Sequence, residues 1–184
     1  MSTKQTRKFY GYLLLLGSIL LFACQQSTHL DGYEVAYFAP KNGGEEIVTP
    51  EKFSESRVMK IGITSSWQAI ADLQAQGQLR AVIIHYSMVD KVDAGQLADW
   101  FANDNVVVAG IGIKGDELAE LVGDAAFYPG PWLRPEQYET PDFFYIYQNQ
   151  KGEHMAGSAI ASDSFQFADA NADYMLATLA GMME

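Results

Sequence analysis

The chain has 184 residues, and its 23 acidic residues outnumber its 12 basic ones to give a formal net charge of −11. Such an acidic surface repels phosphate backbones, so we expect no nucleic-acid partner. The single cysteine excludes an internal disulfide and a cysteine-based metal site, and a domain of about 150 residues buries enough apolar surface to fold without either.

The amino-terminal segment has the composition of a secretion signal. Lys4, Arg7 and Lys8 form a basic start, and residues 12–23 are an apolar run, YLLLLGSILLFA. This run is shorter than the roughly 20 residues of an ordinary membrane span. It stops at Cys24, the only cysteine of the chain, and polar residues follow.

Leu21-Phe22-Ala23-Cys24 resembles the lipobox of bacterial lipoproteins. The resemblance covers only this segment, and no family is identified for residues 33–184. In lipoproteins the cysteine sulfur receives a diacylglycerol, the signal is cut before the cysteine, and the new amino terminus is often acylated too. The resemblance therefore implies a lipid anchor at Cys24. An uncleaved amino-terminal anchor, or an ordinary signal peptide with an incidental cysteine, are the alternatives.

The lipobox resemblance also implies a location and a domain organisation. The domain is expected on the extracytoplasmic side of the cell envelope, at the outer membrane if the cell is Gram-negative, because Gln25 rather than Asp follows the cysteine. The chain then divides into a signal peptide (1–23), a lipidated tether (24–32) and a single α/β domain (33–184). Cleavage removes three basic residues and no acidic one, which leaves 9 basic against 23 acidic residues, a formal charge of −14.

Apolar strands alternate with amphipathic helices along the domain. Residues 33–39 and 58–64 predict the first two strands, and Ser65 with Gln68 forms a capping box that opens a helix ending at Gly77. Residues 80–87 and 105–113 are almost continuously apolar, as is typical of strands covered on both faces.

Two further helices are expected after these apolar strands. Asp93 and Gln96 resemble a second capping box, and Asp116 is expected to cap a short helix that stops at Gly123. Strands and helices joined in this order by short links favour a mainly parallel sheet with right-handed crossovers.

The alternation then breaks at residues 127–142, which hold four of the six prolines. Residues 143–148 and 154–161 predict a hairpin that turns at Gly152, and residues 168–184 predict a final helix. The expected fold is a three-layer α/β sandwich with a mainly parallel sheet, flavodoxin-like or Rossmann-like in outline, with a carboxyl-terminal hairpin and helix.

Gly110, Gly112 and Gly115 match the G-x-G-x-x-G spacing of a dinucleotide site. That motif belongs after the first strand of its fold, with an acidic residue about 20 positions later, whereas here it follows a later strand and precedes the proline-rich loop. Asp116 and Glu117 would also place carboxylates where phosphates would bind. We interpret the glycines as small residues that allow close packing, and expect no cofactor.

Polar residues gather where the strands are expected to end, and open α/β sheets bind ligands at such ends. His85, Ser87 and Asp90 are the catalytic candidates, although no G-x-S-x-G elbow accompanies them. The ligand-binding candidates are Ser65, Ser66, Lys114, Asp116 and Trp132. His85, His154 and Asp163 have no spacing that indicates a metal, so we expect none.

The sequence therefore predicts a lipid-anchored extracytoplasmic domain that binds a small molecule or an envelope protein without catalysis. The alternative is an extracytoplasmic enzyme, hydrolase-like, with its site around His85.

Overall fold

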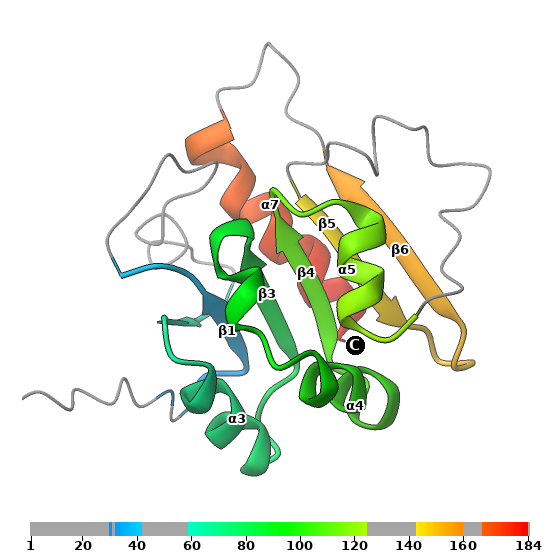
Figure 1. Ribbon diagram of the computed structural model, residues 1–184. Helices are drawn as coiled ribbons and strands as arrows, with labels where there is room; N and C mark the ends of the chain where they lie inside the picture. The colour runs from blue at the N-terminus through cyan, green and yellow to red at the C-terminus, as the bar shows by residue number, and fades with distance from the viewer. Residues whose placement is uncertain (1–29, 31, 42–58, 125–142, 160–166, 184) are drawn as a thin grey trace, which may run out of the picture.

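A computed structural model describes residues 30, 32–41, 59–124, 143–159 and 167–183, which form an α/β fold around a mixed six-stranded sheet (Figure 1). The strands are β1 (Val35–Phe38), β2 (Ile61–Thr64), β3 (Ala81–His85), β4 (Val107–Ile111), β5 (Phe143–Gln148) and β6 (His154–Ala159). The helices are α3 (Trp67–Ala75), the 3₁₀ helix η1 (Tyr86–Lys91), α4 (Ala94–Asp104), α5 (Gly115–Leu121) and α7 (Phe167–Met182).

The strand order is β2-β1-β3-β4-β5-β6. Strand β1 pairs in parallel with both β2 and β3, and β3 pairs in parallel with β4. The last two strands form an antiparallel hairpin that continues the sheet from β4. The parallel core and the carboxyl-terminal hairpin expected from the sequence are therefore both present.

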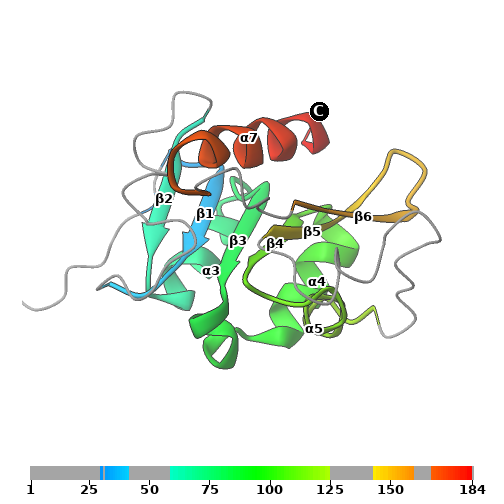
Figure 2. The ribbon, with the colours of Figure 1, turned by 90° about the horizontal axis from the view of Figure 1, so that it is seen from above.

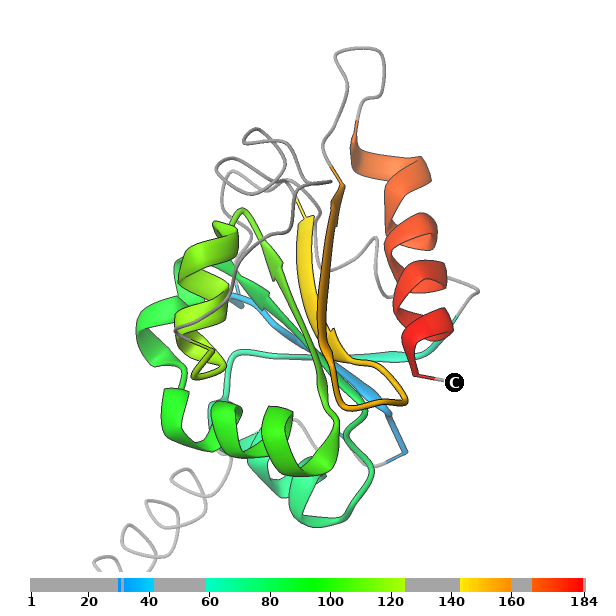
Figure 3. The same ribbon diagram turned by 90° about the vertical axis from the view of Figure 1, so that its right-hand side faces the viewer.

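Both faces of the sheet are covered, which explains the continuous apolar runs. Ala36 and Phe38 belong to a core shared with α3, α4 and α5, whereas Val35 and Tyr37 belong to a second core shared with α7. Neighbouring residues of a strand point to opposite faces, so β1, β3, β4 and β5 each contribute to both cores. Figures 2 and 3 show α7 on one side of the sheet and the other α-helices on the opposite side. No helix in the described part of the chain is long and apolar enough to cross a membrane.

Helix α3 starts one residue later than expected, so the capping box at Ser65 and Gln68 is wrong. Thr64 Oγ1 accepts a hydrogen bond from Ser66 N at 3.0 Å, which turns the chain at Ser66. Ser66 then caps the helix by accepting from Ala69 N, and Gln68 donates instead to Asp72.

Only one of the two hydrogen bonds expected in the capping box of α4 is present. Asp93 accepts from Gln96 N at 3.0 Å, as predicted. The Gln96 side chain does not reach back to Asp93 but accepts from Trp67 Nε1 at 2.9 Å. A contact between two helices has thus replaced the second half of the local capping box.

The expected cap of α5 at Asp116 is wrong, because the helix begins at Gly115 and Asp116 lies inside its first turn. Asp116 Oδ1 accepts from Glu117 N at 2.9 Å, and Glu117 Oε2 accepts from Lys114 N at 3.4 Å. Both carboxylates lie near the positive end of the helix dipole and stabilise it. The predicted stops of α3 and α5 at Gly77 and Gly123 are confirmed by their positive φ angles.

Packing against protein side chains accounts for the glycines of the G-x-G-x-x-G motif. A Cβ at Gly110 would lie 2.8 Å from Ile113 Cβ, and one at Gly115 would lie 2.8 Å from Phe144 Cζ. Gly112 has a φ of 67° and turns the chain directly after β4. The close approach that the motif allows is made by Ile113 and Phe144.

We predict that Gly115→Ala destabilises the domain by about 1–3 kcal/mol, since the new methyl group must displace the Phe144 ring. Gly95→Ala is the matched control, because its nearest neighbour would be Asp93 Oδ1 at an ordinary 3.4 Å. That change in α4 should leave stability unchanged or raise it by up to about 1 kcal/mol. Urea unfolding of both variants measures the difference, and equal stabilities would contradict the packing of Phe144 on Gly115.

Candidate functional site

The direction of the connections reverses at the centre of the sheet. The chain passes from β1 outward to β2 on one side, and from β3 to β4 on the other. The carboxyl ends of β1 and β3 lie side by side at this reversal, with Phe38 opposite Ile84. Open α/β sheets bind ligands outside the carboxyl ends of their strands at such a position.

His85 is the last residue of β3 and lies at this reversal, with only 1% of its surface exposed. Its Nδ1 accepts from Ser87 N at 3.2 Å and lies 2.7 Å from Ser87 Oγ. Because a backbone N–H can only donate, Nδ1 carries the lone pair, and the proton of the neutral ring lies on Nε2.

The structure brings His85 and Ser87 together, as expected, but by a different route. The sequence placed both residues on one side of a strand ending near residue 87. Strand β3 instead ends at His85, and the hydrogen bond from Ser87 N to the imidazole starts the 3₁₀ helix η1. His85 is therefore the amino-terminal cap of η1, and this role explains a buried histidine without any catalysis.

The contact between His85 and Ser87 is also compatible with a catalytic role. The Ser87 hydroxyl lies within hydrogen-bond distance of the Nδ1 lone pair and is exposed, so Nδ1 can accept its proton. Asp90 does not complete a triad in the described structure: its side chain is exposed on η1 and forms no hydrogen bond with the described residues. Two of the three catalytic candidates are thus in contact.

Tyr86 lies between these two residues and was missed by the sequence reasoning. Its surface is 47% exposed, and its ring centroid lies 4.5 Å from that of His85 in a tilted arrangement. Tyr86 and Met155 are the exposed large hydrophobic side chains among the described residues. The sequence signal that could have identified Tyr86 is its position as an aromatic residue directly after a buried strand.

The ligand-binding candidates that the structure describes follow the carboxyl ends of β2 and β4. Ser65 and Ser66 follow β2, where the Ser66 hydroxyl caps α3. Lys114 and Asp116 are exposed at the start of α5, beyond β4. Trp132 lies outside the described residues, as does Cys24.

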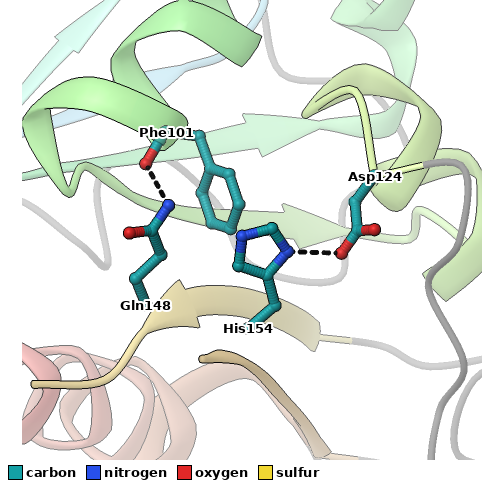
Figure 4. A network of polar contacts seen from close by, with 4 residues as sticks. All are labelled: Phe101, Asp124, Gln148 and His154. Carbon is teal, nitrogen blue, oxygen red and sulfur yellow. Dashed lines mark hydrogen bonds and ion pairs between the residues drawn. The ribbon is translucent and has the colours of Figure 1, made fainter. Parts of the chain in front are cut away.

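A second polar cluster joins the hairpin to the helices (Figure 4). His154 Nδ1 lies 2.7 Å from Asp124 Oδ2, and its ring contacts Phe101 edge-on at a centroid distance of 5.0 Å. Gln148 Nε2 donates to the Phe101 carbonyl oxygen at 3.0 Å. These contacts connect β5 and β6 to α4 and to the end of α5, which indicates a structural role.

A surface hollow of about 300 Å³ lies at the opposite end of the parallel strands from His85. Its lining comes from the chain before β3 and β4, the β5–β6 turn and the end of α7. The lining residues are Leu79, Arg80, Asp104, Asn105, Gln148, Asn149, Gln150, Met182 and Met183. We place the candidate site at the carboxyl ends instead, because the only buried histidine of the described chain lies there.

The described residues contain no group of three or more His, Cys, Asp or Glu side chains that could hold a metal ion. His85 ends β3, whereas His154 begins β6, a strand of the same direction, so the two rings lie toward opposite ends of the sheet. Asp163 is outside the described residues.

Comparison with protein-family models, curated proteins and solved structures gives no match. Within the described chain, His85, Tyr86 and Ser87 are the group at the reversal of the strand connections.

We predict that His85→Ala destabilises the domain more than His85→Asn, by about 1 kcal/mol, which is the usual value of a side-chain cap. The asparagine Oδ1 can replace Nδ1 as the acceptor for Ser87 N, whereas alanine leaves that N–H without its partner. Thermal or urea unfolding of the two variants measures the difference. If the alanine variant is as stable as the asparagine variant, the capping role of His85 is wrong.

Proposed function

We propose that the protein is a lipid-anchored, extracytoplasmic domain that binds an envelope protein, without catalysis, through the surface around Tyr86. The observation that carries the binding role is the half-exposed Tyr86 ring held against buried His85 at the reversal of strand connections. Tyrosine is enriched at protein interfaces because its ring offers a large rigid contact and its hydroxyl a hydrogen bond.

The contact with His85 supports this role because it limits the movement of Tyr86 before binding. A side chain that is already ordered loses less conformational entropy on association. The fold gains little from the exposed half of the ring, since burial of apolar surface is what stabilises a fold. An ordered but uncovered aromatic ring is thus better explained by an interaction than by stability.

The finer outline that we propose for the fold is a three-layer, flavodoxin-like sandwich. Its support is the parallel order β2-β1-β3-β4 together with helices on both sides of the sheet. The antiparallel β5 and β6 depart from that outline. The order differs from the 3-2-1-4-5-6 of the Rossmann fold, so we prefer the flavodoxin-like alternative.

The proposed anchor is the lipid on Cys24, supported by the basic start, the short apolar run and the lipobox-like residues of the sequence. Each buried CH₂ contributes about 0.8 kcal/mol to membrane affinity, so two or three acyl chains hold a protein stably at a bilayer. Electrostatic attraction to anionic lipids cannot replace the lipid anchor, because the domain is strongly acidic.

We predict that Cys24→Ala abolishes lipid attachment and releases the domain from membranes, whereas Ser27→Ala, a nearby change that spares the sulfur, leaves it membrane-bound. Fractionation and intact-mass analysis of both proteins provide the test. Retention of the Cys24→Ala variant on membranes would support an uncleaved apolar anchor and refute the lipid anchor.

The binding surface can be tested by photo-crosslinking in intact cells. A photoreactive phenylalanine analogue in place of Tyr86 should form specific crosslinks with an envelope protein, and the same analogue in place of Met155 should not. Met155 is the matched control because it is also a large, exposed hydrophobic side chain, on the distant strand β6. Equal crosslinking at both positions, or none at position 86, would contradict the proposal.

A hydrolase is the second candidate, favoured by the 2.7 Å contact between His85 Nδ1 and Ser87 Oγ. In this mechanism Nδ1 accepts the hydroxyl proton while Ser87 Oγ attacks an acyl carbon, and the same proton passes to the leaving group as its bond to that carbon breaks. Water then hydrolyses the acyl-serine ester, which releases the acid and restores the Ser87 hydroxyl. A fluorophosphonate should then label Ser87 in the native protein and fail to label the stable His85→Asn variant. Absence of labelling in the native protein would remove this candidate.

A further inference from the structure

We infer that the anchor holds the domain with its β2 edge toward the bilayer and its β5–β6 hairpin pointing into the aqueous space. The inference rests on the proposed lipid at Cys24. It adds an orientation, and therefore identifies which surfaces a partner can reach.

The described part of the chain enters the folded body at Leu30, directly beside β2. Leu30 is only 5% exposed and belongs to the core on the α3 side of the sheet. A Cβ at Gly62, in β2, would lie 2.5 Å from Leu30 Cδ2, so glycine is needed there to admit the leucine side chain.

Two further hydrogen bonds hold this entry point. Tyr33 N donates to the Leu30 carbonyl oxygen at 3.1 Å, and Gly32 N donates to Gln78 Oε1 at 3.3 Å. Leu30 and Gly32, within the stretch 24–32 that the sequence assigned to the tether, thus contact the domain.

The length of chain before Leu30 limits how far the domain can stand from its anchor. Six residue steps separate Cys24 from Leu30, and an extended chain spans at most about 3.6 Å per residue, so the tether reaches about 20 Å. The position of Leu30 over β2 therefore keeps the β2 edge within about 20 Å of the acylated cysteine.

The far edge of the sheet lies beyond this reach. Strands β2 and β6 are at opposite edges of the sheet, as Figure 2 shows. Five strand spacings of about 4.8 Å separate them, or roughly 24 Å. A pose with β6 on the bilayer and β2 pointing away would place Leu30 farther from the surface than the tether permits.

Charge favours the same orientation. The chain after cleavage would carry a formal charge of −14, so anionic lipid headgroups repel the body and favour the pose that keeps most of it away from the surface. Arg80, near the amino end of β3, lies 4.0 Å from Glu34, and both side chains are largely exposed. We therefore expect the tether to set the orientation in high salt as well as in low salt.

Lys60→Cys and Lys151→Cys form a matched pair of probe positions. Both lysines are exposed and lie at the same end of the sheet, Lys60 just before β2 and Lys151 in the β5–β6 turn. Cys24 is the only native cysteine, and its sulfur carries the diacylglycerol in the proposed form, so the introduced thiol is the one that a maleimide fluorophore labels.

The experiment uses full-length lipidated variants, purified from membranes and reconstituted in vesicles with nitroxide-labelled headgroups. We expect the fluorophore at position 60 to be quenched several-fold more strongly than the one at position 151, in low and in high salt. Equal quenching, or stronger quenching at position 151, would overturn the orientation. Thermal unfolding of both variants confirms that each label reports on a folded domain.

Intact-mass analysis of the same preparations distinguishes a failure of the proposed lipid anchor from a failure of the proposed orientation. A mass without the lipid increment on Cys24 would refute the anchor, and the orientation with it. A lipidated protein with equal quenching would leave the anchor standing and refute the orientation alone.

Discussion

The structure depends on the parallel pairing of β1 with two strands that come later in the chain. Val35–Phe38 lie between Ile61–Thr64 and Ala81–Ile84, and all four residues are at most 1% exposed. This central position makes the connections reverse between β1 and β3, which brings His85 and Tyr86 to the reversal. It also places the entry of the chain at Leu30, beside β2. The proposed binding surface and the proposed membrane-facing edge are thus two consequences of one pairing.

The side chains at the reversal divide into those that the fold uses and those that it does not. His85 is buried and accepts the hydrogen bond that starts η1, so its presence needs no ligand. Gly110, in β4, and Gly115, at the start of α5, leave room for Ile113 and Phe144, and Gly112 turns the chain directly after β4. Tyr86 is different, because 47% of its surface is left in solvent although its ring contacts that of His85 at a centroid distance of 4.5 Å. Among these residues, Tyr86 is the one whose position the fold does not explain.

Features encoded over short distances were predictable from the sequence, and features that depend on distant contacts were not. The cap at Asp93, the stops at Gly77 and Gly123 and the proximity of His85 to Ser87 involve residues close in sequence. The start of α3 was missed because the Thr64 side chain turns the chain one residue later. The pairing of His154 with Asp124 spans 30 residues and has no local signal. The strand order could not be predicted either. A local sequence pattern predicts a strand but does not indicate beside which other strand it pairs.

The central pairing of β1 can be tested most directly by native-state hydrogen exchange. The backbone amides of Val35–Phe38 should exchange only through global unfolding, with the same opening free energy as urea unfolding gives, because strands on both sides must separate before they are exposed. Exchange of these amides by local opening, while β4 and β5 stay protected, would show that β1 is a weakly held edge and contradict the arrangement.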